Sequence, residues 1–74
     1  MGAKRHPVKF DLTEIELRMV PMVADGLGYK EIAAACDRSI KTAGWHVSQI
    51  YRRTGTNGIA QLTRWASRNS LILP

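Results

Sequence analysis

Four side chains able to bind phosphate or base edges recur at helical spacing within SIKTAGWHVSQIYRRTG, residues 39–55. They lie on one stripe at i, i+4, i+7 and i+11, and they are Lys41, Trp45, Ser48 and Arg52. The opposite stripe is mostly apolar, and it comprises Ile40, Ala43, Val47, Ile50, Tyr51 and Thr54. Ser39 is a favoured N-cap and Gly55 a favoured residue after a helix end. The segment therefore predicts a capped helix whose back meets a core and whose front fits a nucleic-acid groove.

The residues that enzymes use do not gather into a catalytic pattern. His46 has no second histidine nearby and no carboxylate after it, so neither a general base nor a metal ligand is indicated. Cys36 is the single cysteine, which rules out an internal disulfide and predicts a small buried side chain. The sequence also lacks a nucleophile elbow and a phosphate-binding loop. We expect no enzymatic activity, no cofactor and no metal.

The charge of the chain is divided between its two halves. The 74 residues carry a net charge of +5, yet all six carboxylates precede Arg38. From Arg38 onward there are six Lys or Arg residues and no carboxylate. Such a basic half is typical of nucleic-acid or anionic-membrane binding, with a merely solvated cationic face as the alternative. No stretch has the ~20 apolar residues of a membrane span, so we expect a cytoplasmic location.

Four helices are predicted, over about 13–25, 29–36, 39–54 and 58–69. Thr13 and Glu16 form a capping box at the first helix, with Leu12 and Leu17 as a hydrophobic staple. Pro21 interrupts that helix and predicts a kink or an irregular turn. Other expected core or capping positions are Val20, Ala24 and Leu27 in the first helix, Ile32, Ala33 and Cys36 in the second, and Asn57 as the cap of the last.

Both ends of the chain differ in composition from the predicted helices. Residues 1–11 are basic through Lys4, Arg5 and Lys9 and lack a helical period, which predicts a flexible arm. At the other end, residues 71–74 form an apolar tail that includes Leu71 and Leu73. We expect this tail to pack back on the domain or to meet a partner. Residues 12–70 then constitute one small domain.

The motifs from Leu12 to Ala66 together resemble the LuxR/GerE-type DNA-binding domain, which is also the output domain of NarL/FixJ-like response regulators. The resemblance begins with L-T-E-x-E-L at residues 12–17 and A-x-G-L at residues 24–27. It continues with K-E-I-A at residues 30–33 and S-x-x-T-x-x-x-H at residues 39–46. Ile50, a basic pair at residues 52–53 and Gly55 complete it. No single motif is specific, but their order and spacing together are.

The resemblance implies an all-α, four-helix domain of the helix-turn-helix type, with its third helix in the major groove. Gly44, Trp45 and Ser48 occupy positions that resemble base-contacting residues. The expected phosphate or flanking contacts are Lys30, Lys41, Thr42, His46, Arg52 and Arg53, and Ser39 and Gln49 complete the DNA-binding set. The last helix is implied to form a homodimer, through Leu62, Trp65 and Ala66.

Some positions depart from the family pattern. Cys36, Arg38 and Ala43 stand where the family has leucine, an aliphatic residue and valine, and residues 56–59 also differ. Family members usually carry a receiver or ligand-binding domain ahead of this one. For a chain of this domain alone, we expect a signal to arrive from another chain, through expression level, or not at all.

Two side chains allow more than one interpretation. Trp45 contacts DNA, belongs to a protein interface, or is half-buried on a rotated helix. Gly44, which costs about 1 kcal/mol relative to alanine in a helix, permits close approach to DNA or is merely tolerated.

The leading hypothesis is a sequence-specific, dimeric transcriptional regulator that binds double-stranded DNA at the nucleoid. The alternative is a protein-interaction module that pairs with a longer LuxR-type regulator as its protein partner.

Overall fold

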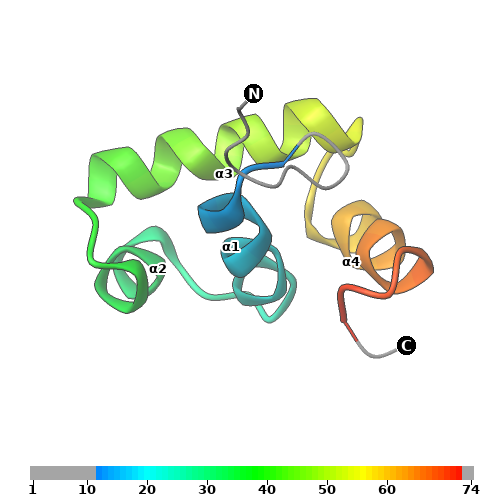
Figure 1. Cartoon of the computed structure of the whole chain (residues 1–74), viewed down its shortest axis with the longest axis horizontal. Coiled ribbons are helices and arrows are strands. Elements are labelled where there is room, and N and C mark those ends of the chain that lie inside the picture. The colour runs from blue at the N-terminus through cyan, green and yellow to red at the C-terminus, as the bar shows by residue number, and fades with distance from the viewer. Residues whose placement is uncertain (1–11, 73–74) are drawn as a thin grey trace, which may run out of the picture.

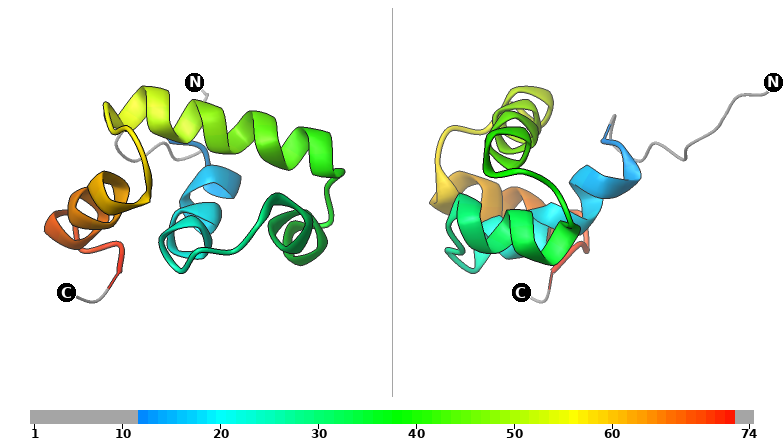
Figure 2. Two further views of the ribbon diagram at one scale, coloured as in Figure 1. Left: turned by 180° about the vertical axis from the view of Figure 1, so that it is seen from behind. Right: turned by 90° about the vertical axis from the view of Figure 1, so that its left-hand side faces the viewer.

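The computed structural model describes residues 12–72, which form four helices: α1 (Glu14–Ala24), α2 (Tyr29–Cys36), α3 (Ile40–Thr54) and α4 (Ile59–Arg68). The all-α fold class is thereby confirmed. Helix α3 lies across one side of the layer that α1, α2 and α4 form, with α1 beneath its middle (Figure 1). Two further views show the same arrangement from behind and nearly along the α3 axis (Figure 2). The predicted basic arm, Leu73 and Pro74 lie outside the described residues.

The start of α1 is fixed by the predicted capping box. The Thr13 hydroxyl accepts the N–H of Glu16 at 3.3 Å, and the Glu16 carboxylate accepts the N–H of Thr13 at 3.2 Å. Leu12 is fully buried just before this turn. The helix continues without interruption through Pro21, so the predicted irregular turn is absent. The Pro21 carbonyl still accepts the N–H of Asp25 at 3.0 Å, which keeps the last turn regular.

The buried side of α1 differs from the predicted one. Its fully buried or nearly buried residues are Glu16, Met19, Val20 and Val23. Leu17, Ala24 and Leu27, which were predicted to face the core with Val20, are only half-buried. Glu16 points inward, as described below. The buried side of α1 is therefore shifted by about one residue from the predicted side.

A three-residue turn joins α2 to α3 and sets the angle between them. Asp37 adopts a left-handed conformation with φ of 56°, which reverses the chain directly after α2. The Arg38 guanidinium donates to the carbonyl of Cys36 at 3.1 Å and so closes the end of α2. Ile32, Ala33 and Cys36 are buried against α3 as predicted. Two helices joined in this way constitute the helix-turn-helix unit.

Ser39 caps α3, and its replacement tests how much this cap stabilises the domain. The Ser39 hydroxyl accepts the N–H of Thr42 at 3.1 Å and donates to the Thr42 hydroxyl at 2.9 Å. We expect Ser39→Ala to lower the free energy of unfolding by about 1 kcal/mol, because the first turn of α3 loses a hydrogen-bond acceptor. Urea unfolding followed by circular dichroism measures this change, and an unaltered free energy would show that water replaces the cap without loss.

Helix α4 and the residues after it pack against the core on the side of α1 that is away from α2 (Figure 1). Leu62 and Ala66 are fully buried, and Leu71 and Ile72 pack against the same core. The N–H of Leu71 donates to the carbonyl of Ala66 at 2.8 Å, so the described part of the tail folds back. The predicted cap at Asn57 is wrong: Gly58 occupies the N-cap position, and the N–H of Asn57 donates to the Gln61 side chain.

Candidate nucleic-acid interface

The predicted front of α3 is exposed along its whole length. Lys41, Trp45, Ser48 and Arg52 are all solvent-exposed. Their spacing of three or four residues puts them on one side of the helix. The opposite side of α3, formed by Ala43, Val47 and Ile50, is buried. We refer to these four exposed residues as the outer stripe. The stripe lies opposite the buried side of α3, and the other three helices all lie on one side of α3 (Figure 1).

Trp45 is the largest apolar group on the outer stripe. It keeps 55% of its surface exposed, and Ala43, Val47 and Ile50 form the buried side as predicted, so α3 is not rotated, although nearly half of the Trp45 surface is covered. Its indole meets the ring of His46 edge-to-face, with the ring centroids 5.1 Å apart. Such a contact restricts the rotation of the indole. An exposed indole on the same stripe as Lys41 and Arg52 is suited to apolar contact with a thymine methyl or a sugar.

The remaining predicted DNA contacts differ in their surroundings. Ser39 lies exposed at the start of α3, where it is engaged with Thr42, and Lys30 lies exposed in the first turn of α2. Thr42 and Gln49 are half-buried on the flank of α3 that faces α1. The geometry thus brings the outer stripe together as one surface and leaves these four residues at its margins.

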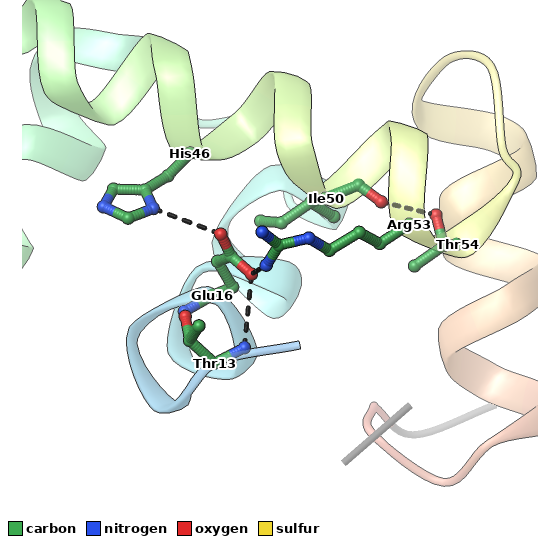
Figure 3. A network of polar contacts seen from close by, with 6 residues as sticks. All are labelled: Thr13, Glu16, His46, Ile50, Arg53 and Thr54. Atoms are coloured by element: carbon green, nitrogen blue, oxygen red, sulfur yellow. Dashed lines mark hydrogen bonds and ion pairs between the residues drawn. The ribbon is translucent and has the colours of Figure 1, made fainter. Parts of the chain in front are cut away.

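His46 and Arg53, both expected to contact phosphate, reach toward α1, and their contact with phosphate stays a prediction. Nδ1 of His46 lies 3.3 Å from Oε2 of Glu16, and Nη1 of Arg53 lies 2.5 Å from Oε1. Figure 3 shows both side chains converging on this carboxylate from α3. Their first partner is therefore a residue of the protein itself.

Glu16 is the centre of this contact, and its side chain is only 1% exposed. A buried carboxylate is costly unless hydrogen bonds and opposite charges surround it. Glu16 meets that requirement through Arg53, His46 and the N–H of Thr13. One side chain consequently caps α1 and links it to the middle and the last turn of α3. The cap can be predicted from the sequence but the contact with α3 cannot, because nothing local to Glu16 indicates partners 30 and 37 residues away.

The flank of α3 that faces α2 carries a contact that sequence analysis missed. The Tyr29 ring lies beside Gly44, where an added Cβ would stand 3.2 Å from Cε2 of the ring. Ile40, one turn before Gly44, is 53% exposed instead of buried as predicted.

Burial, and next the neighbouring Tyr29 phenol, raise the pKa of Tyr51, which keeps that hydroxyl protonated at neutral pH.

The predicted dimerisation residues do not form a surface. Leu62 and Ala66 are fully buried within the monomer, so neither can contact a second subunit in this fold. Both face α1 because they are the apolar residues that α4 contributes to the core. Trp65 is half-buried and packs against the same cluster. The outward residues of α4 are Ile59, Ala60, Gln61, Arg64 and Arg68.

Two features are absent from residues 12–72. That range contains no group of three or more histidine, cysteine or carboxylate side chains placed to hold a metal ion. It also contains no helix with the length and apolar character needed to cross a membrane.

Comparison with known proteins gives a consistent picture. The profile of the family described as bacterial regulatory proteins, luxR family, matches residues 11–66. Response regulator Rre1 of Synechocystis sp. is 37% identical over 65 residues, which is 88% of this chain and 28% of that protein. The probable transcriptional regulator ycf29 of Cyanophora paradoxa is 33% identical over 69 residues, covering 93% of this chain and 33% of that protein.

A third relative is the oxygen regulatory protein NreC of Staphylococcus aureus, 33% identical over 61 residues. That match covers 82% of this chain and 28% of NreC. The chain thus spans a third or less of the length of these relatives. No solved structure matches the chain at a significant level.

Proposed function

The chain belongs to the luxR family of bacterial regulatory proteins, a family of DNA-binding transcription regulators, and we propose that it recognises specific sites with the outer stripe of α3 in the major groove. The observation that carries the proposal is the joint exposure of Lys41, Trp45 and Arg52 on one side of a helix whose opposite side is buried in the core. A helix of this kind is the element that helix-turn-helix proteins insert into the groove.

The proposed contacts follow from the chemistry of each side chain. Lys41 and Arg52 pair with phosphates at the two ends of the stripe, since cations there gain from counterion release. Trp45 and Ser48, between them, contact base edges. Lys30, Ser39, Thr42 and Gln49 remain proposed as flanking contacts, because they lie at the margins of the same surface. No step requires a cofactor.

Arg52 and Arg53 are adjacent in sequence but differ in surroundings, and this pair separates phosphate contact from structural support. We expect Arg52→Ala to weaken binding to all duplexes alike and to reduce the slope of log K against log [salt] by about 0.9, the value for one phosphate contact. Fluorescence anisotropy titrations across a salt series measure that slope.

Arg53→Ala is the matched control for Arg52→Ala. Because Arg53 is engaged with Glu16, we expect its removal to lower the thermal midpoint and to leave the salt slope nearly unchanged. If instead Arg53→Ala reduces the slope as much as Arg52→Ala does, Arg53 contacts phosphate directly. The assignment of Arg53 to the support of α3 would then be wrong.

A homodimer on paired half-sites about one helical turn apart is the proposed active form. The contact surface is the outward side of α4, centred on Ile59 and Ala60, since Leu62 and Ala66 are unavailable. Ile59 is 47% exposed, which favours this end of α4. Sedimentation of the parent and of Ile59→Glu, with and without DNA, measures the oligomeric state. A monomer on a two-site duplex would contradict the dimer.

The alternative of a protein-interaction module that modulates a longer LuxR-type regulator is less well supported. Such a module has no need of exposed Lys41 and Arg52 beside Trp45, whereas DNA binding uses all three. A regulator of this kind acts on the chromosome, so we infer a cytoplasmic location at the nucleoid.

Selection from a pool of randomised duplexes tests the proposal directly. We expect enrichment of a motif with two related half-sites. The Trp45→Ala protein, taken through the same selection, shows whether the enriched positions depend on the outer stripe. A pool that remains random after repeated rounds with the parent protein would contradict sequence-specific recognition.

A further inference from the structure

Tyr29 is a large aromatic residue at the first position of α2, yet half of its surface (50%) is exposed. An exposed ring of this size forgoes burial that would stabilise the fold. Its phenol hydroxyl forms no hydrogen bond with another residue of the range 12–72. The side chain is thus positioned on the protein surface with an unused donor and acceptor.

The position of the ring depends on Gly44. A Cβ added at residue 44 would stand 3.2 Å from Cε2 and 3.3 Å from Cδ2 of Tyr29. Carbon atoms in ordinary contact lie about 3.5–4.0 Å apart. A methyl group at residue 44 would therefore push the ring outward, and a longer side chain would displace it. Because Gly44 has no side chain, it leaves the space in which the Tyr29 ring lies against α3.

Gly44 also borders the outer stripe. It follows Lys41 by three residues and precedes Ser48 by four, which makes both its neighbours on the helix surface. The Tyr29 ring beside Gly44 accordingly extends the outer stripe toward α2. Lys30, next to Tyr29, is an exposed cation in the same turn of α2. Tyr29 and Lys30 thus provide an exposed phenol and an exposed ammonium group in the same turn of α2.

We propose that Tyr29 is a further DNA-contacting residue, held against Gly44 so that its hydroxyl donates a hydrogen bond to a backbone phosphate on the α2 side of the groove. This proposal rests on the proposed function and adds a contact to it. It also gives Gly44 a role different from the two considered above. Gly44 allows the Tyr29 ring to lie against α3. The ring then covers the backbone of α3 at Gly44, which is where close approach of DNA was expected.

A double-mutant cycle tests the dependence of Tyr29 on Gly44, with anisotropy titration on the duplex selected by the parent protein. In the parent background, we expect Gly44→Ala to weaken binding about threefold and Gly44→Leu about tenfold, the latter equal to about 1.4 kcal/mol. The Tyr29→Ala background has already lost the proposed contact of Tyr29 with phosphate. In that background, Gly44→Ala and Gly44→Leu should each weaken binding less than about twofold. Equal losses in both backgrounds would overturn the proposal, since Gly44 would then act on DNA directly.

Tyr29→Phe isolates the hydroxyl while keeping the ring on Gly44. We expect a loss of about threefold to tenfold on the selected and the scrambled duplex alike, because a phosphate contact carries no sequence information. Tyr51→Phe is the matched control, since it removes a phenol hydroxyl from the same flank, and should change affinity less than about twofold. An unchanged affinity for Tyr29→Phe, or an equal loss for Tyr51→Phe, would overturn the assignment.

Thermal unfolding of each variant separates binding from folding. Alanine is the better helix former, so Gly44→Ala should keep or raise the thermal midpoint while it weakens binding. A lowered midpoint that accounts for the loss of affinity would overturn the proposal. If the parent itself shows no preference for any selected duplex, the proposed function fails. Preference by the parent with full affinity in Tyr29→Ala contradicts only the inference about Tyr29.

Discussion

The Trp45→Ala protein is expected to fold as stably as the parent and to bind the selected duplex roughly tenfold to a hundredfold less tightly. The size of the loss follows from the behaviour of central aromatic residues at interfaces, whose removal costs about 2 kcal/mol or more. Stability should not change, because the 55% exposed indole contributes little to the core. Anisotropy titration measures the affinity, and urea unfolding measures the stability of the same sample.

Trp45→Phe is the graded control for this prediction. It retains an aromatic ring over the same position, so we expect a loss intermediate between that of the parent and that of Trp45→Ala. Binding to a scrambled duplex should differ little among the three proteins, because phosphate contacts dominate there. Full affinity of Trp45→Ala for the selected duplex would remove Trp45 from the DNA interface and favour the protein-interaction alternative.

Glu16→Ala is expected to lower the free energy of unfolding by about 2–4 kcal/mol. The change removes the cap of α1, and it leaves the partly buried Arg53 and His46 without their carboxylate. Native domains are stable by only about 5–15 kcal/mol, so the variant should melt at a much lower temperature. Urea unfolding followed by circular dichroism gives the value.

Glu31→Ala is the matched control for Glu16→Ala. Glu31 also accepts an N–H three residues before it, that of Gly28 at 2.8 Å, but it is exposed and forms no ion pair within residues 12–72. Its removal should cost about 1 kcal/mol or less, the value of a cap alone. Equal costs for the two variants would mean that the tie between α1 and α3 adds nothing to stability.

The four helices could be predicted because their signals are local. Thr13 with Glu16, Ser39 and Gly55 mark helix ends within a few residues, and the structure places each of them at a helix end. The outer stripe followed from the same logic, since helical period alone puts its members on one side. Local pattern therefore identified both the fold class and the exposed front of α3.

The errors concern side chains whose partners are distant in sequence. Glu16 was assigned only a capping role, and its burial, which rotates the core side of α1, depends on Arg53 and His46 from α3. Ile40 follows the apolar period of α3, yet it is 53% exposed at the first position of that helix. Hydrophobic period specifies which residues share a side, but not how far along the helix the neighbouring elements reach.

Gly44 and the last helix show a second reason for the errors. A glycine within a helix indicates that space is needed, but the sequence does not say which group uses it, and here Tyr29 does. In α4, the apolar residues Leu62 and Ala66 are equally consistent with a core side and with a dimer side. Only the packing of α4 on α1 assigns them to the core of the monomer.

The most direct test of sequence-specific recognition by the outer stripe is a pair of anisotropy titrations of the parent protein across a salt series. One uses the duplex obtained by selection, and the other uses the same bases in scrambled order. We expect the selected duplex to bind about 10³-fold more tightly at physiological salt, a ratio typical of specific regulators. Equal and weak binding to both duplexes that disappears as salt rises would reduce the interaction to charge attraction and contradict the account.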